Sequence, residues 1–497
     1  MVTTARQATW HDAARNTALP TGAFIDGAYC PSTDGATFTR INPATGEPLA
    51  TITECTSADV DRAVSAAARR FASGEWRNAD PSERKRVLLR FAELIREHSH
   101  ELALLETLDT GKPIGQTTTV DAPACAATIQ WYAETLDKLY DEVAPSGKGS
   151  VITIRREPVG VVAAVVPWNF PLIITSWKIG PALAAGNSVI LKPAEESSLA
   201  GIRLGALATE AGIPAGAFQV LPGRGHVTGE ALGRHDQVDA VAFTGSTEIG
   251  KRFLNYAGDS NMKRVALECG GKSPQIVTRE CEDLDKAAEA IAWSIWYNQG
   301  ETCHAGSRLL VDRSVRDALL DKVNAWMATF EPGDPLDPET NMGAMIAAEH
   351  LERVQEYLEL ARADGALVHG GDRVEHPTGG AYMRPAVITG MNNDMRAARE
   401  EIFGPVLSVI EFEGLSEAIE IANDTHYGLA ASIWTDRISD AHRVAGELRA
   451  GTVWINCYDQ AAVATPFGGY KQSGIGRDRS LHAFDKYTEI KTTWLEL

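Results

Sequence analysis

The chain has 497 residues, of which 44% are hydrophobic and 23% are charged, and this length and balance predict a folded protein of two or three domains. Its 47 Lys and Arg against 66 Asp and Glu give a formal charge of -19, so nucleic acid is not expected as a partner. The sequence has no run of about 20 apolar residues and no secretory start, which predicts a cytoplasmic protein without a membrane partner.

Seven cysteines are spread along the chain without paired spacing, at positions 30, 55, 125, 269, 281, 303 and 457. An odd number in a long chain argues against a disulfide framework, so most should be buried thiols. No CxxC pair, HExxH motif or His/Cys cluster with zinc spacing is present, and no metal is expected. The chemistry is therefore expected from side chains and an organic cofactor.

The hydrophobic periodicity changes along the chain. Residues 59–140 predict helices, because apolar residues recur every three or four positions and Pro81 or Ser82 marks one start. From 151, short β-rich runs end in Pro or Gly turns and alternate with helical stretches, which predicts a parallel sheet with crossover helices. A second α/β series begins near 272, so a domain boundary is expected near 270. The last segment, 487–497, alternates like an edge strand that could pair with another subunit.

The segment VVPWNFP (165–171) places one amide side chain between two prolines. Pro167 and Pro171 restrict the backbone around Asn169. Such an amide can donate a hydrogen bond to an oxyanion that develops during a reaction, although a turn or capping Asn fits the residues equally well.

Two turns have features of a nucleotide site. In ILKPAEES (190–197), Lys192 and Glu195 follow a strand, where a carboxylate can bind ribose hydroxyls. In AFTGSTEIGKR (242–252), Gly245 and Ser246 precede a helix that carries Gly250, so the helix N-terminus can face a pyrophosphate. The usual GxGxxG spacing is absent, and Gly and Ser also cap many ordinary helices.

A carboxylate and a thiol are the candidate catalytic groups. Glu268 ends the β-rich run of RVALECGGKSP (264–274), and α/β folds place catalytic groups at strand ends, although an isolated Glu before Gly-Gly is more often a solvated turn residue. Cys303, in NQGETCHAGSR (298–308), lies among small and polar residues where backbone amides can approach a bound oxygen. Taken alone, a single cysteine is usually a small core residue, but the two groups together favour a nucleophile and a base.

His304 follows the candidate nucleophile directly and suggests a Cys-His protease. Adjacent side chains in an extended segment point to opposite faces, so His304 and Cys303 are expected to pair poorly. The protease hypothesis is therefore disfavoured.

Seven motifs, in order over nearly the whole chain, resemble the aldehyde dehydrogenase superfamily. They are PWNFP, KPAE, FTGST, LECGGKSP, NQGETCHAGSR, EEIFGPV (400–406) and PFGGYKQSGIGR (466–477). Within the superfamily, LALLETLDTGKPI (102–114) and SLHAFDKYTEIKTTWLEL (480–497) resemble the branch that oxidises gamma-glutamyl-gamma-aminobutyraldehyde and related amino- or guanidinobutyraldehydes.

This resemblance implies an α/β fold with three parts. A Rossmann-like NAD-binding domain would comprise 8–139 and 159–270, and a second α/β catalytic domain would comprise 271–470. A small β oligomerisation element would join 140–158 with 484–497, which implies a homodimer or homotetramer.

The resemblance also implies residue roles. Cys303 would be the nucleophile, Glu268 the general base, and the Asn169 side chain with the Cys303 amide the oxyanion hole. Lys178 would take part in a proton path. The cofactor site would be lined by Trp168, Lys192, Glu195, Gly225, Gly245, Ser246, Gly250, Glu401 and Phe403. The substrate tunnel would be lined by Asp121, Trp177, Tyr297, Asp459 and Phe467.

Three features depart from the family pattern. Cys269 places a second thiol beside the predicted base, and an oxidative disulfide with Cys303 stays an open alternative. Asp478 stands where many relatives have Glu, which bears on the path through Lys178. The segment 460–463 lacks the acidic residue expected in aminoaldehyde relatives.

The predicted reaction is NAD-dependent oxidation of a small aldehyde to a carboxylic acid. It would proceed through a thiohemiacetal and a thioester on Cys303, hydrolysed with Glu268 as base. Glu268 argues against transfer of the acyl group to coenzyme A, and its presence with Cys303 and Asn169 argues against a non-catalytic structural relative. NAD is favoured over NADP because the charge of Glu195 would repel a 2'-phosphate.

The predicted substrate is a linear aldehyde of moderate length with an amino, guanidino or gamma-glutamylamino end. Aromatic walls at Trp177 and Phe467 could stack on a cation, and Asp121 and Asp459 could neutralise it, although both acids also fit helix-start and turn positions. A broad-specificity aliphatic or aromatic aldehyde dehydrogenase is the alternative.

Overall fold

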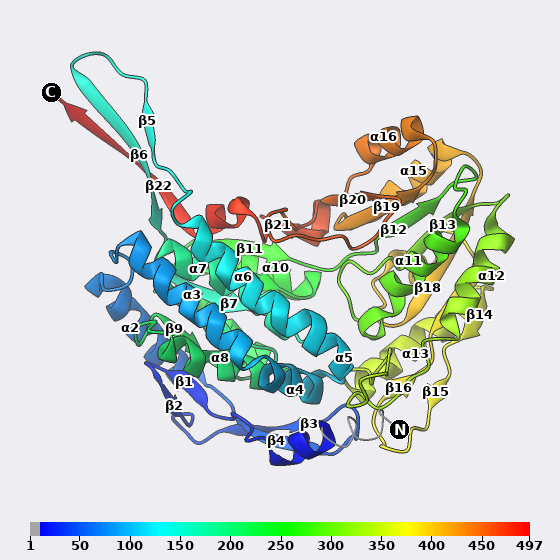
Figure 1. Ribbon diagram of the computed structural model, residues 1–497, viewed down its shortest axis with the longest axis horizontal. Coiled ribbons are helices and arrows are strands. Elements are labelled where there is room, and N and C mark those ends of the chain that lie inside the picture. The colour runs from blue at the N-terminus through cyan, green and yellow to red at the C-terminus, as the bar shows by residue number, and fades with distance from the viewer. Residues whose placement is uncertain (1–9) are drawn as a thin grey trace.

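Two large, mostly parallel sheets and a smaller projecting sheet organise the computed structural model, which describes residues 10–497 (Figure 1). The α/β fold class is confirmed. The first two residues of the predicted NAD-binding domain, 8 and 9, lie outside the described residues. Among residues 10–497, no helix is both long and apolar enough to span a bilayer.

The first large sheet has the strand order β2-β1-β9-β8-β7-β10-β11-β21. Its five central strands, from β9 to β11, run parallel, and β1, β2 and β21 are antiparallel additions. Its strands are β1 (Ala23–Ile25), β2 (Ala28–Cys30), β7 (Val161–Val165), β8 (Ser188–Lys192), β9 (Phe218–Val220), β10 (Ala240–Thr244), β11 (Arg264–Glu268) and β21 (Gly474–Ile475). The last strand comes from the C-terminal part of the chain, outside the segments predicted for this half.

The helices of this half cover both faces of the sheet (Figure 1). They are α2 (Ser57–Ser73), α3 (Pro81–Glu97), α4 (Ser99–Thr110), α5 (Ile114–Gln116), α6 (Ala122–Thr135), α7 (Pro171–Ala185), α8 (Leu199–Glu210), α9 (Glu230–Arg234) and α10 (Thr247–Gly258). Pro81, one of the two predicted starts, is the first residue of α3, where the missing N–H of proline costs nothing and the Asp80 carboxylate caps the Ser82 amide.

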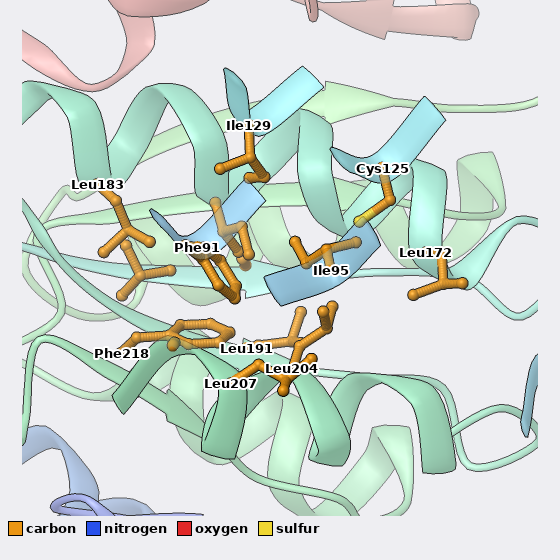
Figure 2. Packing of buried hydrophobic residues seen from close by; sticks show 14 of the residues in the cluster. Phe91, Ile95, Cys125, Ile129, Leu172, Leu183, Leu191, Leu204, Leu207 and Phe218 are labelled. Carbon is orange, nitrogen blue, oxygen red and sulfur yellow. The ribbon is translucent and has the colours of Figure 1, made fainter. Parts of the chain in front are cut away.

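A large apolar core lies between these helices and the sheet (Figure 2). Strands β7 and β8 are buried along their whole length, so they are continuously apolar rather than alternating. Burial of each large side chain contributes about 1.5–3 kcal/mol. The labelled members are Phe91, Ile95, Cys125, Ile129, Leu172, Leu183, Leu191, Leu204, Leu207 and Phe218. This packing fixes the strand ends that carry the sequence motifs.

The second large sheet has the order β14-β17-β18-β13-β12-β19-β20. Only β14 is antiparallel to its neighbour. Its strands are β12 (Pro274–Val277), β13 (Arg308–Asp312), β14 (Leu367–Gly370), β17 (Ala386–Met391), β18 (Val406–Phe412), β19 (Ala430–Trp434) and β20 (Thr452–Ile455). Its helices are α11 (Leu284–Trp296), α12 (Arg316–Met327), α13 (Ala348–Ala363), α14 (Arg396–Arg399), α15 (Leu415–Asn423) and α16 (Ile438–Glu447).

The third sheet projects from the body as an arm (Figure 1). Strand β22 (Thr488–Glu496) pairs antiparallel with β6 (Ser150–Pro158), which pairs with β5 (Glu142–Ala144). The C-terminal segment therefore forms its strand within its own chain, and its other edge has no strand partner in residues 10–497. Two further pairs complete the strands: β3 (Thr37–Ile41) with β4 (Pro48–Thr53), and β15 (Arg373–Val374) with β16 (Tyr382–Met383).

Candidate active site

The carboxyl ends of neighbouring parallel strands bring the candidate residues to one edge of the first sheet. Strands β10 and β11 pair in register, with Thr244 opposite Glu268, and β7 lies on the other side of β10. The turns that follow β7, β10 and β11 carry Asn169, Gly245 and Gly270. Open α/β sheets bind ligands at such an edge.

The Cys303 loop packs directly on the turn that follows Glu268. A Cβ added to Gly271 would lie 2.8 Å from the carbonyl oxygen of Cys303, so only glycine allows this approach. Asn169 is buried, and its Nδ2 donates to the carbonyl oxygen of Glu301 at 2.8 Å. Asn169, the Gly270-Gly271 turn and half-buried Cys303 therefore form one site.

His304 contacts Cys303, contrary to the sequence expectation that the two would pair poorly. The Cys303 Sγ and the His304 Nδ1 lie 3.7 Å apart, and His304 Nε2 lies 2.8 Å from Oδ1 of Asp459. The expectation assumed an extended segment, whereas Cys303 and His304 occupy a turn, where adjacent side chains can share a face. The three side chains form a continuous polar chain.

The contacts among Asp459, His304 and Cys303 determine the charges beside the sulfur. Burial lowers the pKa of His304, but the Asp459 carboxylate outweighs it and raises that pKa to about 10, so the ring is a cation at neutral pH. Burial raises the pKa of the Cys303 thiol, and the His304 cation opposes this, while Glu268 and Glu401 add to it. His304 is therefore the neighbour that favours the reactive thiolate.

Glu268 is buried, and its Oε1 has no hydrogen-bond partner among residues 10–497. Burial, together with the nearby Asp478 carboxylate, raises its pKa to about 8. Asp478 accepts from Lys178 Nζ at 2.5 Å and also pairs with Lys486. Lys178 and Asp478 therefore form a buried ion pair beside Glu268.

Glu401 approaches the same turn from the second half of the chain. Its Oε1 accepts from the Gly271 amide at 3.0 Å, and a Cβ on Gly270 would lie 1.9 Å from its Oε2. Burial raises the pKa of Glu401 to about 7. Nearby, the rings of Trp168 and Phe403 meet edge to face at 5.3 Å.

The remaining candidate cofactor residues gather at the ends of β8 and β10. Lys192 Nζ donates to Oε2 of Glu195 at 3.2 Å, and the Gly225 amide lies 3.4 Å from Oε1 of the same carboxylate. The Glu195 side chain is 35% exposed and so remains open to a ligand.

The turn after β10 leads into α10. Ser246 caps this helix by accepting from the Ile249 amide, and Gly250 allows α10 to approach Cys269, whose Sγ would lie 3.0 Å from an added Cβ. Gly245 donates its amide to the Glu268 carbonyl at 3.1 Å. An open helix N-terminus beside a carboxylate fits the pyrophosphate and ribose of a dinucleotide.

A cavity of about 730 Å³ opens in front of Cys303. Four of the five residues that the family resemblance implied for the substrate tunnel line it: Trp177, Tyr297, Asp459 and Phe467. Asp121 does not line it: this fully buried carboxylate pairs with Lys112 Nζ at 2.7 Å. The spacing of Lys112 and Asp121 in the sequence does not reveal that buried pair, because α5 and the π-helical turn Thr117–Asp121 bring the two side chains together.

Two cationic residues of the cavity were not predicted to act there. Arg479 lines the cavity, and its guanidinium lies 5.0 Å from the ring centroid of Trp177 and 4.9 Å from that of Phe467. His304 lines it as well. A signal for Arg479 was its position two residues after the SGxGR motif, in a segment that also carries Asp478.

Comparisons with known proteins agree with this geometry. A family model described as "Aldehyde dehydrogenase family" matches residues 29–493. The chain is 50% identical over 479 residues to an aminoacetaldehyde dehydrogenase of Pseudomonas aeruginosa, covering 96% of both chains.

Two solved structures extend the comparison. A mutant of an indole-3-acetaldehyde dehydrogenase of P. syringae, in complex with NAD+ and IAA, is 52% identical with a TM-score of 0.98, and the match covers 99% of both chains. A gamma-glutamyl-gamma-aminobutyraldehyde dehydrogenase of Burkholderia cenocepacia is 54% identical with a TM-score of 0.97 and the same coverage.

Proposed function

The chain belongs to the aldehyde dehydrogenase family, and we propose that it oxidises a small aldehyde to the carboxylic acid with NAD as cofactor. One observation carries the proposal: the half-buried Cys303 thiol lines a 730 Å³ cavity, while the buried Asn169 amide binds the loop two residues before it and the buried Glu268 carboxylate, with its raised pKa, is close enough to act on the pKa of the thiol. This combination supplies a nucleophile, an oxyanion donor and a base.

Cys303, as the thiolate, attacks the aldehyde carbon and forms a thiohemiacetal. One N–H of Asn169 Nδ2 donates to Glu301, so the second remains for the developing oxyanion together with the Cys303 backbone amide. Such a donor contributes about 3–4 kcal/mol. Bound NAD supplies the hydride acceptor for the oxidation. The acyl group then remains on Cys303 as a thioester.

Glu268 completes the turnover by removing a proton from the water that hydrolyses the thioester. Its pKa of about 8 lies near neutral pH, where a general base is most effective. The Lys178 and Asp478 pair beside it offers a route for that proton away from the site.

The proposed cofactor contacts follow from the geometry at the ends of β8 and β10. Glu195 and Lys192 would bind ribose hydroxyls, and the N-terminus of α10 at Gly245 and Ser246 would receive the pyrophosphate. Glu401, with Trp168 and Phe403, would contact the nicotinamide end. The carboxylate of Glu195 favours NAD over NADP, since a 2'-phosphate would be repelled.

The proposed substrate carries an amino, guanidino or gamma-glutamylamino group on a butyraldehyde chain. The names of the aminoacetaldehyde and gamma-glutamyl-gamma-aminobutyraldehyde relatives support this class. The similarity to the indole-3-acetaldehyde enzyme supports an alternative, a broad-specificity enzyme that also accepts aromatic aldehydes, because Trp177, Tyr297 and Phe467 line the cavity.

We also propose that the enzyme is a cytoplasmic homo-oligomer joined through 140–158 and 484–497. Along β22, Ile490, Trp494 and Leu495 are exposed, and Trp494 keeps 67% of its accessible surface. An exposed apolar strand at a sheet edge is typical of an interface.

The experiment that tests the proposal is an NADH absorbance assay on the purified protein with simple aldehydes. An increase in absorbance with NAD alone, without coenzyme A, is expected. Absence of any signal with every aldehyde would support a structural relative, and a requirement for coenzyme A would support an acylating enzyme.

A further inference from the structure

Arg479 is a buried cation in the wall of the proposed substrate cavity, and none of residues 10–497 serves as its hydrogen-bond acceptor. The residue is 8% exposed, its Nε is buried without a hydrogen-bond partner, and no hydrogen bond or ion pair joins its side chain to any group in residues 10–497. It is nevertheless part of the cavity wall. A desolvated guanidinium is costly unless a counter-charge meets it.

The two carboxylates that interact most strongly with the charge of Arg479 are already paired with other cations. Asp459 accepts from His304, which is itself positively charged, and Asp478 is held by Lys178 and Lys486. Arg479 interacts with both acids only over a longer range. Together, His304, Asp459 and Arg479 leave the cavity wall with one uncompensated positive charge.

The aromatic walls that were expected to stack on a substrate cation already hold Arg479. Its guanidinium lies over both Trp177 and Phe467, at 5.0 Å and 4.9 Å from the ring centroids. A substrate ammonium at the same place would meet a like charge. The ring faces accept no conventional hydrogen bond, so the donors of the guanidinium remain available to a ligand in the cavity.

We infer that Arg479 binds a carboxylate at the end of the substrate remote from the aldehyde. The inference rests on the proposed function. Of the three proposed end groups, only the gamma-glutamylamino group carries a carboxylate, so it is preferred over a free amine or guanidine. The planar guanidinium can donate two parallel hydrogen bonds to such a group.

The geometry also requires a spacer between carbonyl and carboxylate. Phe467 lies between the two ends of the site, because its ring contacts both the Arg479 guanidinium and the His304 ring, the latter at 5.5 Å. His304 in turn contacts Cys303. A carboxylate at Arg479 and an aldehyde carbon at Cys303 must therefore span the width of one aromatic side chain.

The test compares three aldehydes of equal length that end in a carboxylate, in its neutral primary amide, and in an ammonium. Wild-type enzyme should show the highest kcat/KM with the carboxylate. The Arg479→Gln variant should raise KM for the carboxylate by about tenfold or more, leave the amide within about twofold, and improve the ammonium substrate. Arg479→Lys should retain part of the carboxylate preference.

Arg443→Gln is the matched control, since Arg443 is an exposed residue of α16 that pairs with Glu447. It should leave all three substrates unchanged. If wild type shows no carboxylate preference, or if Arg479→Gln changes all three aldehydes by the same factor, Arg479 only supports the wall and the inference is wrong. If no aldehyde is oxidised by wild type, the proposed function itself fails. Should Arg479→Gln not fold, the wild-type series and Arg479→Lys still decide.

Discussion

His304 donates from Nε2 to Oδ1 of Asp459 at 2.8 Å, while its other ring nitrogen faces the Cys303 sulfur. The carboxylate keeps the imidazole protonated well above neutral pH, with a pKa of about 10. Asp459 stands at a φ of 55°, a strained conformation for a residue other than glycine, so the surrounding loop must hold it toward His304.

From this pair we predict a shift in the reactivity of Cys303. His304→Gln removes a cation that lies beside the sulfur below pH 10, so the pKa of the Cys303 thiol should rise by about one unit or more. The rate of alkylation by iodoacetamide should then fall at neutral pH, and its inflection should move to higher pH. Asp459→Asn should have a smaller effect in the same direction.

Exposed His442 provides the control for this experiment, and His442→Gln should leave the alkylation profile unchanged. Identical profiles for wild type and His304→Gln would show that the imidazole does not act on the thiol.

Cys303→Ala should abolish aldehyde oxidation and leave NAD binding intact, because no other thiol is proposed to reach the carbonyl. Cys30→Ser, at a half-buried cysteine of β2, should retain wild-type activity. Steady-state turnover and NAD titration measure the two properties. Turnover by Cys303→Ala above a few per cent of wild type would contradict the assignment.

Glu268 should impose a pH dependence on turnover. The carboxyl is protonated below its pKa of about 8, so the rate of thioester hydrolysis should rise with pH up to that value and then level off. Glu268→Gln should release one burst of NADH and then stall at every pH. Loss of the burst as well would place Glu268 in the first half-reaction.

Cofactor preference should depend on the carboxylate at position 195. Wild type should have a higher kcat/KM with NAD than with NADP. Glu195→Gln should lower the ratio of the NAD value to the NADP value, because it removes the charge that repels a 2'-phosphate. Glu196→Gln, at the next position, is the matched control. An unchanged ratio in Glu195→Gln would show that this carboxylate does not select the cofactor.

For motifs that lie at the ends of buried strands, the sequence allowed their place in the fold to be predicted. Asn169, Glu268 and Gly245 could be placed together because parallel strands end at one edge, and the apolar runs of β7, β10 and β11 were clear. By contrast, β17, β19 and β20 were not identified, because a short apolar run such as AASIW in β19 does not distinguish a buried strand from a buried helix.

Side-chain partnerships between distant segments could not be read from the sequence. The family resemblance implied that Asp121 lines the tunnel, but the π-helical turn Thr117–Asp121 brings its carboxylate to Lys112 instead. The expectation that His304 pairs poorly with Cys303 assumed strand geometry, and it is wrong because the two residues lie in a turn. The sequence does not indicate a role for Arg479, because its contact with Trp177 of α7 joins two segments that are far apart in the chain.

The late position of strand β21 in the chain has a consequence for folding during synthesis. This strand pairs with β11, placing Gly474 opposite Glu268, and the same late segment supplies Asp478 and Arg479. Domains fold as they emerge during translation, beginning at the N-terminus. The central strands and the Cys303 loop can therefore form during translation. The surroundings of Glu268, which are needed for hydrolysis, are completed only when β21 and Asp478 have been synthesised. An unfinished or C-terminally cleaved chain would thus hold a thiol that can be acylated without the surroundings that release the product.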